Sequence, residues 1–277
     1  MGGSLPARGL ALALAATLAA GAAMADDKPS VQVRTRADAV GDVYRFRSDS
    51  RYAETTSEGQ ATQTNSQVFE VEVLGVAGDG LKLRYTLKEA TLTDTAGPAM
   101  AKALNALVGI PLEFRVRTDG MLFALDNWTD YKARVLAGVD AALPAGDPIR
   151  NTYHQRFAQE PINAAEDMVL ADLRLMAVME PRGPVAIGLS DVVDNRRRPP
   201  GRAVSDVSVS KAGCVVRVVH ISASRTPGVV QDLTTEAQVS IHDGRTLTLT
   251  QKRADRAGGQ SSEEQVTIRR LSAAPSC

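Results

Sequence analysis

The feature that most constrains the fold of this chain is the alternation of apolar and polar residues over long stretches. Residues 81–88 read LKLRYTLK, so every second side chain is apolar and the ones between are Lys, Arg or Thr. The same two-residue period runs through 43–52, 69–73 and 110–117. Successive side chains of a β-strand point to opposite faces of its sheet, so this period is typical of strands with one covered face and one face in water.

Glycine-containing turns separate these stretches. Asp-Gly occurs at 79–80, 119–120 and 243–244, and Ala-Gly at 212–213. Asp-Gly between two alternating runs indicates a β-hairpin, and hairpins join antiparallel strands. The polar run 53–66 is expected to be a loop or a frayed hairpin end, because it is rich in turn-forming and polar residues.

The middle of the chain, 127–180, changes to a helical pattern. Asn127 is a candidate N-cap, Asp147-Pro148 and Pro161 fit helix starts, and 162–179 carries apolar residues at steps of three and four. The alternating pattern then returns. The order predicts an α+β fold: a predominantly antiparallel, curved, half-barrel-like β-sheet, with the central helical segment covering one face.

The first 25 residues are expected to lie outside the fold. Arg8 precedes an apolar run over 9–22, and Ala23-Met24-Ala25 has the A-x-A form of a signal-peptidase site. This layout predicts a secretory signal peptide cleaved after Ala25, and a retained anchor is the alternative. The run is shorter than the roughly 20 residues that span a bilayer. Residues 26–277 are then a single β-rich domain in the periplasm of a bacterium.

Composition excludes two classes of protein. Hydrophobic residues make up 44% of the chain, which is enough for a packed core and argues against wholesale disorder. Lys plus Arg number 32 and Asp plus Glu number 32, so there is no electrostatic reason to expect nucleic acid as a partner.

Two cysteines, Cys214 and Cys277, follow the predicted leader. An oxidising compartment permits a disulfide between them, which would tie the C-terminal tail to an internal strand. The other interpretation, a buried small side chain at Cys214 and a free terminal thiol at Cys277, has equal weight, because sequence does not give the geometry that a disulfide requires.

Sequence motifs for catalysis are absent. The chain contains no G-x-S-x-G, H-E-x-x-H, G-x-G-x-x-G or Walker motif, and its three His residues are not paired at short spacing. No cofactor or metal site is therefore predicted. His154 could form an acid/base cluster with Glu160 and Asp167 if neighbouring helices fold together, although a surface histidine is the simpler interpretation. His220, on an apolar-rich strand, is expected to be structural.

Two further segments allow a binding role. Arg196-Arg197-Arg198 could hold an anion, but such a run is more often a solvated linker. The apolar residues of 168–179 could cover either a cavity or a solid core. If a cavity lies between sheet and helices, the candidate ligand-contacting residues are Leu83, Tyr85, Phe114, Leu173 and Met176.

The turn and strand Asp119-Gly120-Met121-Leu122-Phe123-Ala124-Leu125 resembles units of exported β-rich bacterial proteins of unknown function. More remotely, the exported chain with hairpins around a helical middle is similar to the LolA/LppX-like periplasmic carriers. That resemblance implies a half-barrel sheet capped by helices that holds a lipid-like ligand, and it assigns no role to any single residue.

Together these observations favour a soluble periplasmic protein that binds or carries an apolar or envelope-derived ligand without catalysis. The alternative is a periplasmic hydrolase that uses His154 and nearby carboxylates. A third class, an outer-membrane protein with membrane-spanning strands, would need aromatic girdles, and the chain has only one Trp, five Tyr and five Phe. The sequence makes no prediction of oligomeric state.

Overall fold

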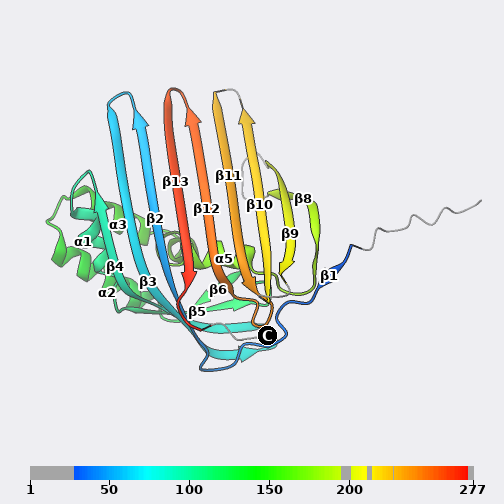
Figure 1. Cartoon of the computed structure of the whole chain (residues 1–277). Helices are drawn as coiled ribbons and strands as arrows, with labels where there is room; N and C mark the ends of the chain where they lie inside the picture. Colours follow the sequence, from blue (N-terminus) through cyan, green and yellow to red (C-terminus); the bar gives the residue numbers. More distant parts are fainter. Residues whose placement is uncertain (1–27, 195–200, 211–213, 227, 274–277) are drawn as a thin grey trace, which may run out of the picture.

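The computed structural model describes residues 28–194, 201–210, 214–226 and 228–273. Eleven strands form one sheet in the order β6-β5-β4-β3-β2-β13-β12-β11-β10-β9-β8 (Figure 1). Every neighbouring pair is antiparallel. The strands are β2 (Val43–Thr56), β3 (Gly59–Ala77), β4 (Gly80–Asp94), β5 (Pro111–Arg117), β6 (Leu122–Leu125), β8 (Gly188–Asp194), β9 (Gly201–Ser210), β10 (Val215–Thr226), β11 (Val229–Ser240), β12 (Thr246–Ala257) and β13 (Gln260–Arg270).

The two β-rich thirds of the chain meet in the middle of this sheet. Strand β2 pairs with β13 from Phe46↔Arg270 to Thr55↔Ser261, so the first long strand lies beside the last. Within each third, strands that are consecutive in sequence lie side by side in the sheet, and helix α1 lies between β4 and β5 in the chain. The sheet is open and curved, which confirms the predicted α+β class with a mostly antiparallel sheet.

Five helices follow β4 and β6 along the chain. They are α1 (Ala99–Asn105), α2 (Trp128–Ala142), α3 (Pro148–Phe157), α4 (Pro161–Met168) and α5 (Ala171–Met179). Helices α1, α2 and α3 contact one another beside β4 and β5, whereas α5 lies on the inner face of the sheet and reaches β12 (Figure 1). No helix among the described residues is long and apolar enough to cross a membrane.

The core lies between the inner face of the sheet and these helices. On β2 the side chains of Tyr44 and Phe46 are 4% and 2% exposed, while Arg47, one residue on, is exposed on the opposite face. Phe69 of β3 is fully buried, with its ring centroid 5.5 Å from that of Phe46 and 5.4 Å from that of Tyr85. The alternation in the sequence therefore marks the inner and outer faces as expected.

The helix predicted over 162–179 is two helices in the structure. The amides of Val169 and Leu170 both donate to the carbonyl of Ala165, at 3.0 and 2.9 Å, and α5 starts anew where the amide of Arg174 donates to the carbonyl of Leu170. Neither Gly nor Pro causes this break. Val169 and Leu170 are 8% and 4% exposed, so their burial in the core stabilises the bend.

Asn127 precedes α2 as predicted but does not cap it. Its side chain makes no capping hydrogen bond; its Oδ1 accepts from the amide of Glu113 at 2.8 Å, and its Nδ2 donates to the carbonyl of Pro111 at 3.1 Å. The residue therefore fixes the start of α2 to β5 rather than satisfying the helix end. Asp147 and Glu160, in contrast, do cap α3 and α4.

The polar run 53–66, expected to be a loop or a frayed hairpin end, is mostly strand and forms the paired end of the β2–β3 hairpin. Strand β2 continues to Thr56 and β3 begins at Gly59, with pairs as far as Thr56↔Gly59. Pairing with β13 and β4 on either side supplies the hydrogen bonds of these strand ends. This ladder outweighs the low strand propensity of the polar residues.

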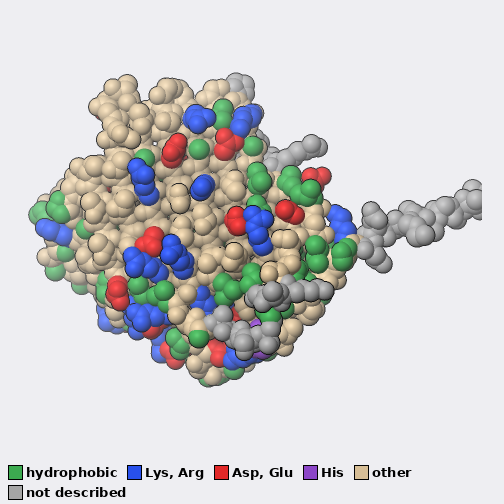
Figure 2. Space-filling model, in the orientation of Figure 1, with side chains coloured by type: hydrophobic (Ala, Val, Ile, Leu, Met, Phe, Trp, Pro, Cys, Tyr) green, Lys and Arg blue, Asp and Glu red, His purple; other side chains and the backbone are tan. Residues whose placement is uncertain are grey.

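On the outer face of the sheet, charged side chains are scattered among other, uncharged side chains and backbone (Figure 2). One group of apolar side chains in this view lies toward β8–β10, where Leu189 is 65% and Ile221 53% exposed. Strand β10 is rich in apolar residues, and the exposure of Ile221 shows that its outer face is in part open.

Candidate functional site

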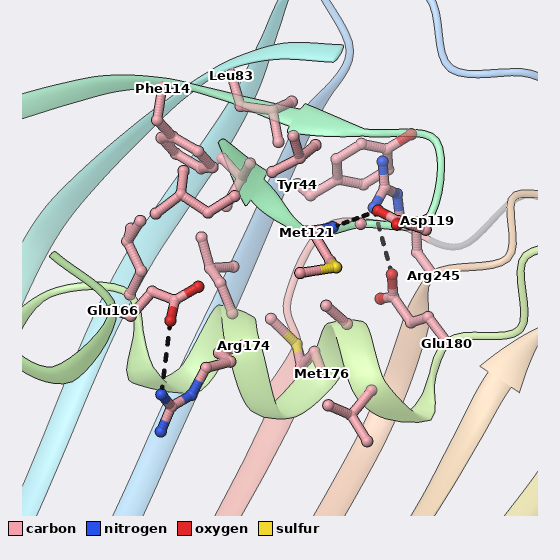
Figure 3. A pocket seen from close by; sticks show the side chains of 18 of the residues that line it. Tyr44, Leu83, Phe114, Asp119, Met121, Glu166, Arg174, Met176, Glu180 and Arg245 are labelled. Atoms are coloured by element: carbon pink, nitrogen blue, oxygen red, sulfur yellow. Dashed lines mark hydrogen bonds and ion pairs between the residues drawn. The ribbon is translucent and has the colours of Figure 1, made fainter. Parts of the chain in front are cut away.

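A pocket lies between the inner face of the sheet and α5. Its volume is about 590 Å³, within the range of roughly 300–1,000 Å³ that small-molecule sites occupy. Strands β2 to β5 form one wall, α5 forms the opposite wall, and the β5–β6 turn closes over it (Figure 3). Several of its lining residues, among them Phe46, Leu83 and Met176, also belong to the buried core, so the pocket lies at the edge of that core.

The middle of the pocket is apolar. Leu83 and Phe114 point into it from the sheet, and Met176 points into it from α5 (Figure 3). Met121, from the β5–β6 turn, reaches across the opening toward Met176 and is 61% exposed. Methionine side chains are flexible and polarisable, so this pair can adapt to an apolar guest.

Four of the five residues predicted to contact a ligand line this pocket: Leu83, Phe114, Leu173 and Met176. The fifth, Tyr85, is not among the lining residues. It is 4% exposed and packs on Phe69, and its burial raises the pKa of its hydroxyl well above the ordinary value. That these residues contact a ligand stays a prediction.

One end of the pocket is closed by a cluster of buried ion pairs. Glu180, directly after α5, is 6% exposed. Its Oε2 lies 3.4 Å from Nη2 of Arg34 and 3.3 Å from Nη1 of Arg245, and its Oε1 accepts from the amide of Thr246 at 2.9 Å. The donors that face this carboxylate come from two distant parts of the chain: Arg34 precedes β2, and Arg245 and Thr246 are consecutive residues where β12 begins.

Asp38 is the second carboxylate of this cluster. It lies 2.8 Å from Nη2 of Arg245 and accepts from the hydroxyl of Tyr44 at 2.9 Å. Burial lowers the pKa of Arg245, but the carboxylates of Glu180 and Asp38 raise it by more, so the net pKa lies above the ordinary value. Burial and the charge of Asp38 raise the pKa of Tyr44 to about 12.

The opposite end of the pocket holds a more exposed set of charges. Arg174 of α5 lies 3.7 Å from Glu166 and 3.3 Å from Asp167, and its side chain is 55% exposed. Figure 3 shows Glu166 and Arg174 at the far side of the apolar stretch from Glu180 and Arg245. The pocket is therefore an apolar channel with charged groups at both ends.

Sequence reasoning missed both Met121 and the buried charge cluster. Arg34, Asp38, Glu180 and Arg245 are dispersed along the chain and match no motif. Met121 directly follows the Asp-Gly turn at 119–120. The sequence predicted this hairpin, but it did not predict that the turn lies over the pocket. The available signal in the sequence was an apolar residue, Met121, directly after a turn that is expected to be exposed.

The cluster proposed for catalysis does not form. His154 on α3 lies 2.7 Å from Asp140 on α2, which also pairs with Arg150 at 2.7 Å. Glu160 caps α4 and Asp167 pairs with Arg174 instead. The grouping of His154 with Glu160 and Asp167 was therefore wrong, because each of the three side chains has a nearer partner.

His154 is also poorly placed for chemistry. Its side chain is 43% exposed on the helical surface, outside the pocket between sheet and α5. The hydrogen bond with His154 lowers the pKa of Asp140. Among the described residues, no group of three His, Cys, Asp or Glu side chains could hold a metal ion.

Three predicted features lie outside the described residues: the leader 1–25, the arginine run 196–198 and Cys277. Cys214 starts the turn into β10 with a φ of 50°, and its carbonyl accepts from the amide of Ile241 at 2.9 Å. The disulfide between Cys214 and Cys277 stays a prediction.

No protein-family model and no curated protein sequence matches the chain. Among solved structures, lipovitellin, from a study of lipid–protein interactions, gives a TM-score of 0.49 at 10% identity over 86% of this chain. The chain spans only 26% of that lipovitellin chain. An outer membrane lipoprotein-sorting protein domain from Vibrio parahaemolyticus gives a TM-score of 0.17 at 11% identity, over 83% of this chain and 87% of its own.

A third structure, DynF from the dynemicin biosynthesis pathway of Micromonospora chersina, gives a TM-score of 0.21 at 6% identity, over 88% of this chain and 86% of its own. All three TM-scores are below 0.5, so these weak likenesses establish neither a shared family nor a function.

Proposed function

We propose that this protein is exported to the periplasm, where it binds and carries an apolar or envelope-derived ligand without catalysing a reaction. The observation that carries the proposal is the pocket of about 590 Å³ between the sheet and α5, with Leu83, Phe114 and Met176 pointing into it. Burial of apolar ligand surface against these side chains supplies the driving force, at about 0.8 kcal/mol for each methylene group removed from water.

The position of the pocket supports a carrier better than a fixed structural cavity. Its opening is bordered by Met121, which is 61% exposed on a short turn. A flexible side chain at the opening lets an apolar molecule enter and leave without unfolding of the sheet. The ion pairs at either end limit the length of the apolar chain that the pocket accepts.

A dye titration tests this function. N-phenyl-1-naphthylamine is uncharged and fluoresces more strongly in apolar surroundings, so its emission should rise when it enters the pocket. Ala177 of α5 lines the pocket, and Ala177→Trp would place an indole ring in the space that the dye needs. We expect this variant to bind the dye at least tenfold more weakly than the unmodified protein.

The matched control is Ala171→Trp. It is the same substitution in the same helix, at a position that is exposed and does not line the pocket. It should bind the dye as the unmodified protein does. Failure of the unmodified protein to bind the dye, or equal binding by both variants, would contradict the proposal.

Location is tested separately. The protein expressed with its first 25 residues should appear in the periplasmic fraction with Asp26 as its N-terminal residue. Native mass spectrometry and lipid extraction of that material would then identify what it carries. A cytoplasmic protein that keeps residues 1–25 would refute the export proposal without affecting the binding measurement.

A further inference from the structure

The charge cluster at the Glu180 end of the pocket contains one more guanidinium than carboxylate. Among the described residues it holds Arg34, Arg182 and Arg245 against Asp38 and Glu180. Arg34 and Arg245 use both carboxylates, at distances between 2.8 and 3.5 Å. Arg182 is therefore left with a positive charge that no carboxylate of the cluster directly neutralises.

Arg182 forms no ion pair or hydrogen bond through its side chain within the described part of the chain. Its Nε is buried and makes no hydrogen bond, and no ion pair joins its side chain to another described residue. Its guanidinium packs against the Cα of Gly120 in the β5–β6 turn, where a Cβ would lie 2.6 Å from the guanidinium carbon. A buried N–H without an acceptor costs free energy, so an acceptor brought by a ligand would be favourable there.

Arg182 and Arg245 both line the pocket. The Nε of Arg245 is likewise buried without a hydrogen-bond partner. Burial and the nearby positive charges of Arg34 and Arg245 lower the pKa of Arg182, although an attraction to Glu180 acts against this. Arginine nevertheless keeps its proton in proteins, so this end of the pocket is lined by two positively charged side chains whose Nε–H groups lack an acceptor.

The carboxylate of Asp119 also lines the pocket and must be counted. It lies on the exposed β5–β6 turn, and its Oδ1 accepts from the amide of Met121 at 2.9 Å. Within the described part of the chain it forms no ion pair with an arginine. At the other end, Arg174 faces two carboxylates, so that end offers no spare positive charge.

We propose that the pocket takes an anionic amphiphile, whose apolar chain lies between Met121 and Met176 and whose carboxylate or phosphate group binds the guanidinium of Arg182. This inference rests on the proposed binding function and narrows its ligand class. The planar guanidinium matches two oxygens of either head group, and a charge-assisted hydrogen bond in a largely apolar site is stronger than one in water.

Competition between matched amphiphiles tests the inference on the unmodified protein. Dodecanoate, dodecyl phosphate, dodecan-1-ol and dodecyltrimethylammonium share one chain length and differ in the head group. Each would displace N-phenyl-1-naphthylamine below its micelle concentration. We expect at least one of the two anions to bind roughly tenfold more tightly than the alcohol, and the cation to bind most weakly.

The variant Arg182→Gln should weaken binding of the preferred anion about tenfold and so remove its preference over the alcohol. Arg256→Gln is the matched control, because it removes the same charge from an exposed position at the end of β12. It should keep the preference for the anion. If Arg182→Gln fails to fold, Arg182→Lys keeps the charge without the planar donor pair, and should retain a smaller preference for the anion over the alcohol.

The outcomes separate the two proposals. Equal affinity for anion and alcohol, with the dye still bound, overturns the head-group site and leaves the binding function intact. An anion preference that survives Arg182→Gln also overturns the assignment to Arg182. Absence of dye binding overturns the proposed function, and the head-group site with it. The relative affinities of dodecanoate and dodecyl phosphate identify which anion the site favours.

Discussion

The two ends of the long central strands differ in what lies on their inner face. Near the pocket this face carries Tyr44, Phe46 and the fully buried Phe69. Toward the hairpin ends, at the top of Figure 1, the same face of β2 and β3 carries Tyr52 paired with Gln63. Tyr52 is 37% exposed. Both ends have the same strand pairing, so the difference reflects what covers the sheet and not the sheet itself.

Helix α5 marks the boundary between these two regions. Asp172, near its start, shares a hydrogen bond with the hydroxyl of Ser48, which is 5% exposed on β2. Beyond Ser48 the inner face of β2 and β3 becomes mainly polar. The same long strands therefore provide both a covered apolar wall for the pocket and an uncovered polar extension, and most of the packing energy is expected at the pocket end.

Ion pairs show the same contrast. Glu180 and its two arginines are between 4% and 16% exposed at the pocket, whereas Arg225 and Asp232 near the hairpin ends are 54% and 46% exposed. Removing one partner of a buried pair leaves an uncompensated charge, while an exposed pair is largely replaced by water. Similar contacts should therefore have very different effects on stability.

The largest difference is expected between Phe69→Ala and Gln63→Ala. Both residues lie on the inner face of β3, but only Phe69 is fully buried between Phe46 and Tyr85. Phe69→Ala should lower the free energy of unfolding by about 4 kcal/mol, and Gln63→Ala by about 0.5 kcal/mol or less. Urea unfolding followed by far-UV circular dichroism measures both. Comparable losses would mean that the polar end is as well packed as the pocket end.

A smaller difference is expected between Glu180→Gln and Asp232→Asn. The first leaves Arg34 and Arg245 with one carboxylate fewer in a buried site and should cost about 3 kcal/mol. The second breaks the exposed pair with Arg225 and should cost less than about 1 kcal/mol. Chemical unfolding monitored by the fluorescence of Trp128, the single Trp, measures the change. If Glu180→Gln left the free energy of unfolding unchanged, the cluster would have to be solvated.

Two asparagines give a third comparison. Asn127 joins α2 to β5 through two hydrogen bonds, whereas the Oδ1 of Asn65, toward the hairpin end of β3, is buried without a partner. Asn127→Ala should cost about 1–2 kcal/mol, because it leaves the amide of Glu113 without its acceptor. Asn65→Ala should be close to neutral. Thermal unfolding of the two variants measures both losses. A larger loss of stability for Asn65→Ala than for Asn127→Ala would show that Asn65 has a structural role.

The smallest effect is expected at the boundary itself. Burial raises the pKa of Asp172, the hydrogen bond with Ser48 acts against the shift, and Glu264 adds to it. When a carboxyl has a higher pKa in the folded than in the unfolded protein, the folded protein loses stability as the pH rises. The loss begins near the pKa of the unfolded state, about 4, and is complete above the pKa of the folded state. Asp172→Asn should therefore raise the melting temperature at pH 7 but not below pH 4. An equal shift at both pH values would exclude ionisation as the cause.

Much of the sheet can be predicted from the sequence. Apolar and polar residues that alternate every second position place all apolar side chains on one side only if the segment is a strand. The hairpins at 79–80 and 119–120 and the change to helices after Asn127 follow from turn and start signals of the same local kind. The break at Val169–Leu170 does not, since it is caused by burial of those side chains against distant residues. The strand ends of 53–66 were missed for a similar reason: their hydrogen bonds come from neighbouring strands.

The candidate site divides in the same way. Local pattern was enough to select Leu83, Phe114, Leu173 and Met176 as inward-facing residues, all of which line the pocket. The local pattern could not distinguish them from Tyr85, which lies on the same face of β4 as Leu83 but packs against Phe69 instead of lining the pocket. Nor could the local pattern identify Arg182, which is of interest because its buried Nε lacks a hydrogen-bond acceptor among the described residues.

The sequence by itself determined which faces of the strands are apolar, where the chain turns and where it becomes helical, because these properties depend on neighbours within a few residues. Only the tertiary structure decided that β2 lies beside β13, that α5 covers one end of the sheet and leaves a pocket, and that two carboxylates meet three arginines. Those outcomes depend on contacts between residues far apart in the sequence, 65 positions for Glu180 and Arg245 and 207 for Asp38 and Arg245. No local pattern records the space or the charge that remains once such contacts are made.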